Sequence, residues 1–360
     1  MLFQAACKTT AMGIMPHTDI DRALELAFGL DIPFWPQLPN VSFYEDMYVQ
    51  ASENFPGIMV DEVNKKLLFD NARFAEELPR YSELILNPDT FKLSERYSVV
   101  YHRFLSRDLS SYPAVRGQLI GPVSFGFRVT DENNRPVIYN DDVRTMLYDF
   151  IQHKVNAQYR ELKAKNPRAF VWLDEPGLGW VFSGLSGYDD LRAKADYGNF
   201  LGGLENPGAL HLCANVNLPY LLGMGTNILS FDAYQLELMP KGYARAVADF
   251  ISNGGIIAWG IVPTASEVLS RETTAALADR LSAYWEVVSR ESRIEPTRIA
   301  EQALIAPARC CLKNIGQVGA CEEKLAGVSP ASMSAEEAVV EKAFGYLKKV
   351  SEILKGRYGR

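Results

Sequence analysis

The stretch ALHLCANVNLPYLLGMGTNILSFDA, residues 209–233, contains two short apolar runs that both end in polar or sulfur-bearing side chains. Runs of four to eight apolar residues between turn residues are typical of strands that are buried on both faces, as in a parallel sheet. The residues between the two runs include Asn, Pro and Gly, which favour turns. This part of the sequence therefore predicts two buried strands, over residues 209–214 and 227–233.

The same pattern recurs along the whole chain of 360 residues. Further strands are predicted over residues 9–15, 32–38, 115–121, 169–175, 255–262 and 302–307. Helical periodicity predicts helices over residues 141–162, 271–290 and 334–354. Eight strands that alternate with helices predict an α/β fold, in which residues 1–360 form a single (β/α)8 TIM barrel and one catalytic domain. A doubly wound open sheet has the same alternation and remains an alternative.

Three local features refine this prediction. Ser334 and Glu337 have the spacing of a capping box, which places the start of the last helix at Ser334. Residues 57–70 and 123–140 each look like a hairpin around a polar turn. Because they follow the second and third predicted strands, we expect both insertions near the C-terminal mouth of the barrel.

Composition excludes several classes of function. The net charge is −7 and no cluster of Lys and Arg offsets it, which argues against nucleic acid as a partner. No apolar run approaches the ~18 residues of a membrane span, and the first residues lack the pattern of a signal peptide. Without a secretory signal, the five cysteines are expected to be reduced thiols or metal ligands. We therefore expect a soluble cytoplasmic protein.

Several predicted strands end in residues that a buried strand does not need. His211 and Cys213 are two residues apart, so on an extended strand their side chains face the same side. Cys310 and Cys311 end the last predicted strand. Thiolate and imidazole groups are zinc ligands, and catalytic zinc sites use three protein ligands with one open position. The pattern predicts a zinc site at the carboxyl ends of the strands, although a packed cysteine beside a hydrogen-bonded histidine would give the same local sequence.

Other candidates are interpreted as structural or remain open. No partner in the sequence singles out the remaining histidines and cysteines, which are His17, His102, His153, Cys7 and Cys321. Asp174 and Glu175 precede Pro176 at the end of a central predicted strand. They either cap a turn or bind substrate, and we favour substrate binding for Asp174 because it tops a barrel strand.

Five segments together resemble the C-terminal catalytic barrel of the cobalamin-independent methionine synthase family. They are TTAMGIMP (9–16), LDEPGL (173–178), HLC (211–213), SFDAY (230–234) and CCLK (310–313). The resemblance covers nearly the whole chain and extends to the wider group with uroporphyrinogen decarboxylase and the corrinoid:thiol methyltransferases. It implies a single-barrel methyltransferase of methionine biosynthesis.

The resemblance also implies a ligand set. By it, His211, Cys213 and Cys310 would hold Zn²⁺. Asp232 would be the carboxylate ligand, with Glu237 as its alternative, since the family has glutamate there at a different spacing. Zinc deprotonates a thiol that coordinates it, and the thiolate is the nucleophile that accepts a methyl group.

The family binds homocysteine as the methyl acceptor. By resemblance, Asp174 would pair with the amino group of homocysteine. The backbone of Met12, Gly13 and Ile14, together with the Glu53 carboxylate, would complete the amino-acid site.

Two departures from the family concern the methyl donor. The family has two barrels, whereas this chain has room for one. The family also has a histidine after the seventh strand that is proposed to protonate folate, and here Val262 occupies that position. Losing a general acid typically lowers the rate of a reaction by ~10²–10⁴-fold. A methyl–cobalt bond needs no proton to break, so we expect a methylcorrinoid, carried by a partner protein, in place of methyl-tetrahydrofolate.

Three alternatives remain at this point. The acceptor could be another small thiol such as coenzyme M, although Asp174 favours an acceptor with an ammonium group. The chain could instead be a non-catalytic zinc protein that serves a corrinoid partner, but structural zinc sites normally have four closed ligands on short loops. Uroporphyrinogen decarboxylase needs no metal and binds its substrate with arginines, which does not fit the Cys/His pattern.

Overall fold

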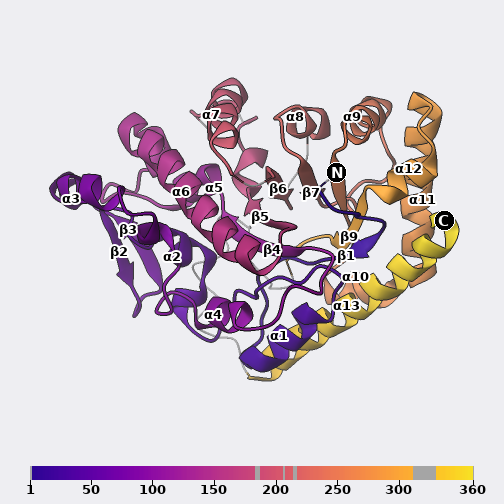
Figure 1. Ribbon diagram of the computed structural model, residues 1–360, viewed down its shortest axis with the longest axis horizontal. Helices are drawn as coiled ribbons and strands as arrows, with labels where there is room; N and C mark the ends of the chain where they lie inside the picture. Colours follow the sequence, from indigo (N-terminus) through magenta and orange to yellow (C-terminus); the bar gives the residue numbers. More distant parts are fainter. Residues whose placement is uncertain (1, 183–186, 206, 214–216, 311–329, 360) are drawn as a thin grey trace.

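A curled parallel sheet forms the centre of the protein, with helices along its outer side (Figure 1). The computed structural model describes residues 2–359 except 183–186, 206, 214–216 and 311–329. Seven strands are hydrogen-bonded in the order β1-β9-β8-β7-β6-β5-β4, and all neighbours are parallel. These strands are β1 (Lys8–Thr9), β4 (Val115–Ile120), β5 (Ala169–Asp174), β6 (Ala209–Leu212), β7 (Ile228–Phe231), β8 (Ile256–Val262) and β9 (Ala303–Pro307).

Helices follow most of the strands and pack against the outer side of the sheet. The α-helices are α1 (Ile20–Phe28), α2 (Met47–Ser52), α3 (Asn71–Leu84), α4 (Val99–Leu105), α5 (Pro122–Arg128), α6 (Asp141–Lys165), α7 (Asp190–Gly202), α8 (Leu218–Leu222), α9 (Lys241–Ser252), α10 (Ser266–Arg271), α11 (Thr274–Ser292), α12 (Pro296–Glu301) and α13 (Pro330–Tyr358). Short 3₁₀ segments are η1 (Phe43–Glu45), η2 (Pro88–Phe91), η3 (Val137–Tyr139) and η4 (Pro176–Gly179). No helix of the described residues is long and apolar enough to cross a membrane.

Alternation along the strands separates the core into two clusters. On β5, Val171 and Leu173 belong to the large cluster that includes the helices, whereas Phe170 and Trp172 belong to a smaller one. The smaller cluster also contains Met12, Ile32, Ala209, Ile228, Ile256, Ala258, Leu304 and Ala306. Because successive side chains point to opposite faces, this set is the concave interior of the curled sheet. On the same face, further toward the carboxyl ends of β5, β6 and β7, lie Asp174, His211 and Asp232.

Residues 32–38 are not a regular strand, which corrects the prediction for this segment. They are held by isolated contacts, namely Ile32 N–H to Thr9 O at 3.0 Å, Gln37 N–H to Gly13 O at 2.7 Å and Arg116 N–H to Pro33 O at 3.0 Å. Pro33 and Pro36 lack the N–H group that a strand ladder needs. These contacts nevertheless link the segment to both edge strands of the sheet, β1 and β4. Strand β1 is likewise shorter than the predicted 9–15, with one further bridge between Ile14 and Gln37.

The two predicted hairpins differ in outcome. Residues 57–70 contain the antiparallel pair β2 (Ile58–Asp61) and β3 (Lys66–Phe69), which lies beside α2 and α3 in Figure 1. For residues 123–140 the prediction is wrong in the first half, which is helix α5, whereas the second half folds back around a polar turn through the antiparallel bridge of Thr130 with Pro136 and the hydrogen bond from Val137 N–H to Val129 O at 3.0 Å. Pro122 stands at the first turn of α5, where its missing N–H costs nothing.

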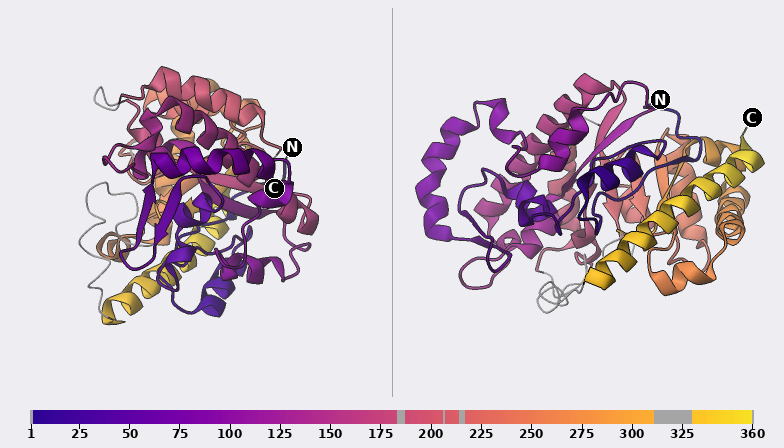
Figure 2. Two further views of the ribbon diagram at one scale, coloured as in Figure 1. Left: turned by 90° about the vertical axis from the view of Figure 1, so that its left-hand side faces the viewer. Right: turned by 90° about the horizontal axis from the view of Figure 1, so that it is seen from below.

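The three predicted helices are present as α6, α11 and α13. Helix α13 begins at Pro330, so Ser334 lies inside it and is not its N-cap. The apolar side chains that recur at helical spacing along it are buried, namely Val340, Phe344, Leu347, Val350 and Leu354. Figure 2 shows α13 running diagonally along the outside of the sheet.

Candidate metal centre

His211 is held by contacts from two neighbouring strands. It lies on β6 directly between Asp174 of β5 and Ser230 of β7 in the strand register. Its side chain is buried, with Nδ1 hydrogen-bonded to Ser230 Oγ at 3.0 Å and its ring centre 5.5 Å from that of Trp172. These contacts fix the orientation of the imidazole, as outer-sphere partners of ligating histidines commonly do.

The Cys213 thiol joins the other two predicted ligands. It is hydrogen-bonded to Cys310, which follows β9, and to His211. Cys213 is a free thiol. The hydrogen bond with Cys310, together with the hydrogen bond and charge of His211, holds the pKa of the Cys213 thiol well below its usual value, against the effect of burial. The neighbouring His211 and Cys213 therefore meet Cys310, which is about a hundred residues away in sequence, at the carboxyl ends of β6 and β9.

The two thiols contact each other through a hydrogen bond. They are not arranged as two ligands around one metal ion. Within the described ranges, no three His, Cys, Asp or Glu side chains have an arrangement that could hold a metal ion. Cys311 lies outside the described residues. One imidazole and two thiols, with Cys213 in contact with both partners, are the donor types that zinc prefers, so the chemistry of these side chains fits the predicted ion although their arrangement in this structure is not that of a metal site.

Asp232 is placed differently from the prediction. Its Oδ2 accepts a hydrogen bond from Arg309 Nε at 2.7 Å, and its Oδ1 accepts one from the backbone N–H of Gln235 at 3.1 Å. With both oxygens engaged, Asp232 is an ion-pair partner of Arg309 in this structure. The alternative ligand Glu237 is exposed. Neither carboxylate is brought against the His211 and Cys213 pair by a recorded contact.

Asp174 is next to His211 and is available for an ionic contact. Burial raises the pKa of Asp174 to about 6, and the charges of His211 and Arg116 lower it. Among the described residues, the carboxylate has no recorded hydrogen-bond partner. At neutral pH it is therefore mostly a buried anion at the carboxyl end of β5, without a direct partner.

Arg116 is a functional candidate that sequence reasoning missed. Its guanidinium is buried inside the curled sheet, over Trp172 at 4.4 Å and Phe34 at 5.0 Å from the ring centres. Burial lowers the pKa of Arg116 to about 9, and Asp174 raises it. The sequence feature that could have identified Arg116 is an arginine within the apolar run 115–121, because a buried charge requires an opposite charge nearby. Arg116 supplies the positive charge below Asp174.

The remaining predicted substrate residues are dispersed. Met12 is in the interior cluster, and the Gly13 carbonyl accepts the Gln37 N–H at 2.7 Å. Ile14 is buried and forms the bridge to Gln37. Glu53 accepts a hydrogen bond from Ser94 N–H at 3.0 Å and lies 3.8 Å from Lys154 Nζ. The structure thus places Met12 in the sheet interior and Ile14 in the larger outer cluster, whereas Glu53 is engaged between α2 and α6.

The residues interpreted as structural make no recorded contact with the three candidate ligands. The His102 ring contacts Leu93 O at 2.9 Å, and His153 lies 3.6 Å from Asp149. Cys7 is buried, and so is His17, whose two ring nitrogens have no hydrogen-bond partner within the described part of the chain. Cys321 lies outside the described residues.

Glu175 is the second residue whose importance the sequence did not reveal. Its completely buried carboxylate accepts hydrogen bonds from Val123 N–H at 3.1 Å and from Ser124 N–H and Oγ at 2.8 and 2.6 Å. It also accepts a hydrogen bond from the Tyr197 hydroxyl at 2.5 Å. Glu175 therefore caps the first turn of α5 and ties it to α7. This contact fixes the chain immediately after Asp174.

Glu175 also predicts a pH dependence of stability. Burial raises the pKa of Glu175 from 4.5 to about 7, although its hydrogen bonds lower it. The folded protein thus retains a proton that the unfolded chain releases, and this stabilisation is complete below pH 4.5 and lost as the pH rises through about 7. Since Glu175→Gln cannot titrate, the unfolding free energy of the wild type minus that of this variant should fall by about 3 kcal/mol between about pH 4.5 and about pH 8. Denaturant titrations of both proteins measure this difference, and a rise with pH would contradict it.

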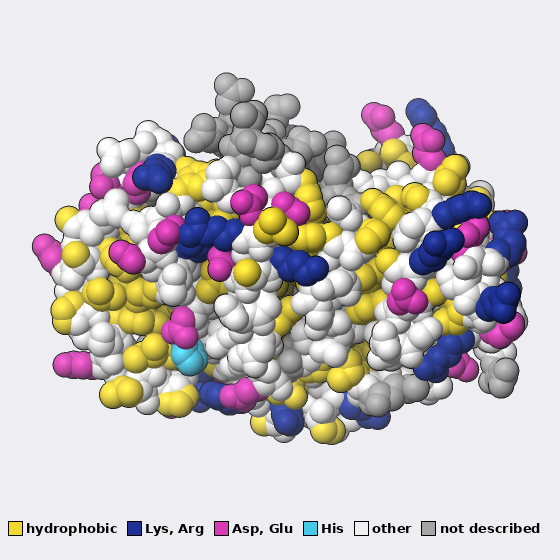
Figure 3. Space-filling model, turned by 90° about the horizontal axis from the view of Figure 1, so that it is seen from above, with side chains coloured by type: hydrophobic (Ala, Val, Ile, Leu, Met, Phe, Trp, Pro, Cys, Tyr) yellow, Lys and Arg dark blue, Asp and Glu magenta, His cyan; other side chains and the backbone are white. Residues whose placement is uncertain are grey.

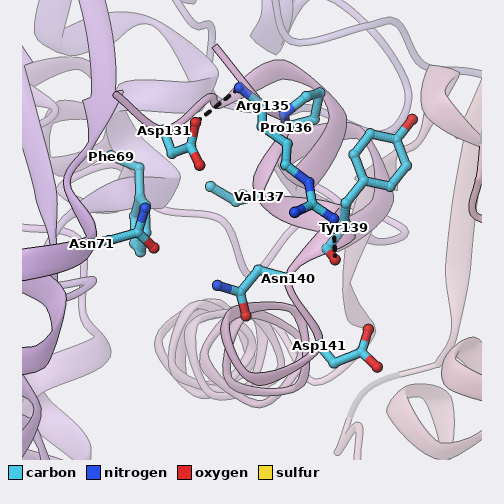
Figure 4. A pocket seen from close by; sticks show the side chains of 9 residues that line it. All are labelled: Phe69, Asn71, Asp131, Arg135, Pro136, Val137, Tyr139, Asn140 and Asp141. Carbon is cyan, nitrogen blue, oxygen red and sulfur yellow. Dashed lines mark hydrogen bonds between the residues drawn. The ribbon is translucent and has the colours of Figure 1, made fainter. Parts of the chain in front are cut away.

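A separate hollow of about 290 Å³ lies between β3 and the start of α6 (Figure 4). Arg135 Nη2 donates to the Tyr139 carbonyl at 3.4 Å, and Asn140 caps α6. Asp131 accepts the backbone N–H of Arg135 at 2.9 Å. These polar groups stabilise the loop itself, and the hollow has no connection to the cluster of His211 and the two cysteines.

On the face in Figure 3, the Lys and Arg side chains of the described residues are interspersed with Asp and Glu.

Fold and site together define an α/β protein with a curled parallel sheet and a His/Cys cluster at the carboxyl ends of its strands. No protein-family model matches the chain, and no curated protein matches it. The solved structures to which the chain is similar include the following three. A B12-independent methionine synthase from Shewanella sp. W3-18-1, solved with selenomethionine, is 15% identical with a TM-score of 0.44 over 68% of this chain and 63% of that chain. This chain thus spans less than two thirds of the Shewanella protein.

The other two similar structures come from different organisms. A putative vitamin-B12 independent methionine synthase from Listeria monocytogenes is 13% identical, with a TM-score of 0.44 over 70% of this chain and 69% of that chain. A methyltransferase from Methanosarcina mazei is 13% identical, with a TM-score of 0.46 over 96% of this chain and 94% of that chain. At these values the likeness carries no argument about activity, which has to be argued from the residues.

Proposed function

We propose that this protein is a zinc-dependent methyltransferase that transfers a methyl group to the thiol of homocysteine and so forms methionine. The observation that supports the proposal is the contact of the Cys213 thiol with both His211 and Cys310 at the carboxyl ends of the strands. This is the end of a barrel at which catalytic residues lie. In this proposal, the seven strands and the irregular segment 32–38, whose contacts link β1 to β4, close a barrel within a single domain.

The three contacting side chains would hold the metal ion. Bound there, Zn²⁺ would lower the pKa of a substrate thiol and leave one position for its sulfur. Ser230 holds the His211 ring through Nδ1, so Nε2 is the nitrogen that would bind the ion. Asp232 is left out of this proposed ligand set because its recorded hydrogen bonds are to Arg309 and to the Gln235 N–H.

Asp174 gives the site its preference for an amino acid. Its carboxylate neighbours His211, so it can pair with the ammonium group of homocysteine while the sulfur lies near the cysteines. Arg116 keeps Asp174 ionised at neutral pH by opposing the effect of burial. The backbone of Met12–Ile14 would complete the pocket from the neighbouring edge of the sheet.

Val262 supports a methylcorrinoid as the methyl donor. It is buried at the end of β8, where a folate-dependent enzyme would need a proton donor. With a methylcorrinoid, the sulfur–carbon bond forms as the carbon–cobalt bond breaks, and cobalt keeps the electron pair as cobalt(I). No proton is required at this position. A partner protein that carries the corrinoid would deliver it to the open end of the sheet.

The proposed function is tested with the purified, zinc-loaded protein and homocysteine. We expect methionine to form with methylcobalamin and not with methyl-tetrahydrofolate. Methionine formed from the folate alone would reverse the choice of donor. A protein that binds zinc but forms no methionine with either donor would instead be the accessory protein considered above.

Asp174→Asn should weaken homocysteine binding while the metal site remains intact. The amide removes the negative charge that would pair with the ammonium group, and a hydrogen bond to a charged group is worth about 1.5–3 kcal/mol. We expect KM for homocysteine to rise about tenfold to a hundredfold, with one zinc per chain retained. Steady-state kinetics measure the change, and 3-mercaptopropionate, which lacks an amino group, is the control acceptor. An unchanged KM would favour a thiol substrate without an ammonium group.

A further inference from the structure

Arg309 lies beside the sulfur atoms but takes no part in the proposed ligand set. It precedes Cys310 in the chain, and its charge acts on both Cys213 and Cys310. Its side chain is 52% exposed, whereas that of its partner Asp232 is 4% exposed. A half-exposed guanidinium at the rim of a buried cluster can contact a molecule that enters from solvent.

Asp232 holds this arginine in a defined direction. The contact runs from Arg309 Nε to Asp232 Oδ2 at 2.7 Å, and the second carboxylate oxygen is fixed by the Gln235 N–H. Because Asp232 follows β7 and Arg309 follows β9, the ion pair spans the end of β8. A buried carboxylate that is held by the backbone restricts the rotation of the arginine side chain.

The terminal amino groups of Arg309 remain for a ligand. Within the described part of the chain, the guanidinium donates its recorded hydrogen bond through Nε, to Asp232. The guanidinium has five N–H donors in a planar fork that matches a carboxylate or sulfonate with two parallel hydrogen bonds. The structure thus provides a pre-oriented anion donor next to the thiols.

We propose that Arg309 is a specificity-determining residue that binds the anionic group of the acceptor thiol, with Asp232 as its positioning residue. Together with Asp174 on the other side of His211, it would select a zwitterionic thiol by both of its charges. The inference rests on the proposed function because it assumes that the acceptor sulfur binds at the His211, Cys213 and Cys310 cluster. It reassigns Asp232 from metal ligand to support for Arg309.

The test uses the full-length protein loaded with Co²⁺, whose thiolate charge-transfer absorption reports thiol binding without turnover. Two acceptors of similar size are compared, 3-mercaptopropionate with a carboxylate and 3-mercapto-1-propanol without charge. We expect the wild type to bind the anionic thiol about tenfold to a hundredfold more tightly. Arg309→Gln should lose this preference, and Asp232→Asn should reduce it. Arg298, which is also half-exposed and paired with Glu301 at 3.2 Å, provides the matched control Arg298→Gln, which should keep the preference.

The outcomes separate this inference from the proposed function. If the wild type binds no Co²⁺, the metal-dependent function itself fails. If Co²⁺ and both thiols bind but the wild type has equal affinity for them, the role of Arg309 is overturned and the function stands. If Arg309→Gln does not fold, the comparison of the two thiols on the wild type still tests whether the protein prefers an anionic acceptor. A full preference in folded Arg309→Gln would also overturn the inference.

Discussion

Cys213→Ser should remove high-affinity zinc binding and methyl transfer together. Structural zinc sites bind with about 10–16 kcal/mol shared among four ligands, so one ligand is worth about 3–4 kcal/mol, or about 10²–10³-fold in affinity. Cys213 contacts both other candidate ligands, and its loss therefore disrupts the whole set. Metal analysis after dialysis should show one zinc per chain in the wild type and almost none in the variant.

The cysteines provide their own controls for this experiment. Cys310→Ser should behave like Cys213→Ser. Cys311→Ser should show whether Cys311 or its neighbour Cys310 supplies the ligand. Cys7→Ala removes a thiol whose pKa burial raises to about 12 and which packs against Ala300, so its zinc content should be unchanged. Retention of wild-type zinc affinity by Cys213→Ser would refute the metal site.

Gly121→Ala should cause the largest loss of stability at the site. A Cβ atom at this position would overlap the Glu175 side chain. Glu175 cannot turn away without breaking the hydrogen bonds that hold α5 and Tyr197. Overpacking and lost buried hydrogen bonds predict a decrease in unfolding free energy of about 3 kcal/mol. Denaturant-induced unfolding of wild type and variant measures it.

The matched control is a glycine with open space around it. Nothing lies within 4 Å of a Cβ atom added to Gly345 in α13. Gly345→Ala should therefore stabilise the protein by up to about 1 kcal/mol through helix propensity. Equal effects of the two substitutions would mean that Glu175 is free to move, and that its contacts do not fix the end of β5.

The local pattern of the sequence was sufficient for the elements that bury apolar side chains. Strands 169–175, 255–262 and 302–307 were located because continuous apolar runs of this length are buried in a parallel sheet. Their observed ranges agree to within two residues at each end. Residues 32–38 were misjudged because apolar character suggested a strand, whereas two prolines prevent a hydrogen-bond ladder. Helix α5 was missed because its cap, Glu175, lies fifty residues away in the sequence.

The candidate site likewise has one part that the sequence specifies and another that only the tertiary structure specifies. The sequence by itself determined that His211 and Cys213 share a face, because side chains two apart on a strand point the same way. The register of neighbouring strands, which is a tertiary property, placed Asp174 beside His211. Tertiary structure alone also decided the roles of charged groups, since Asp232 met Arg309 and Arg116 entered the interior below Asp174. A charge takes its role from the opposite charge that folding brings nearest, and no local pattern in the chain specifies that partner.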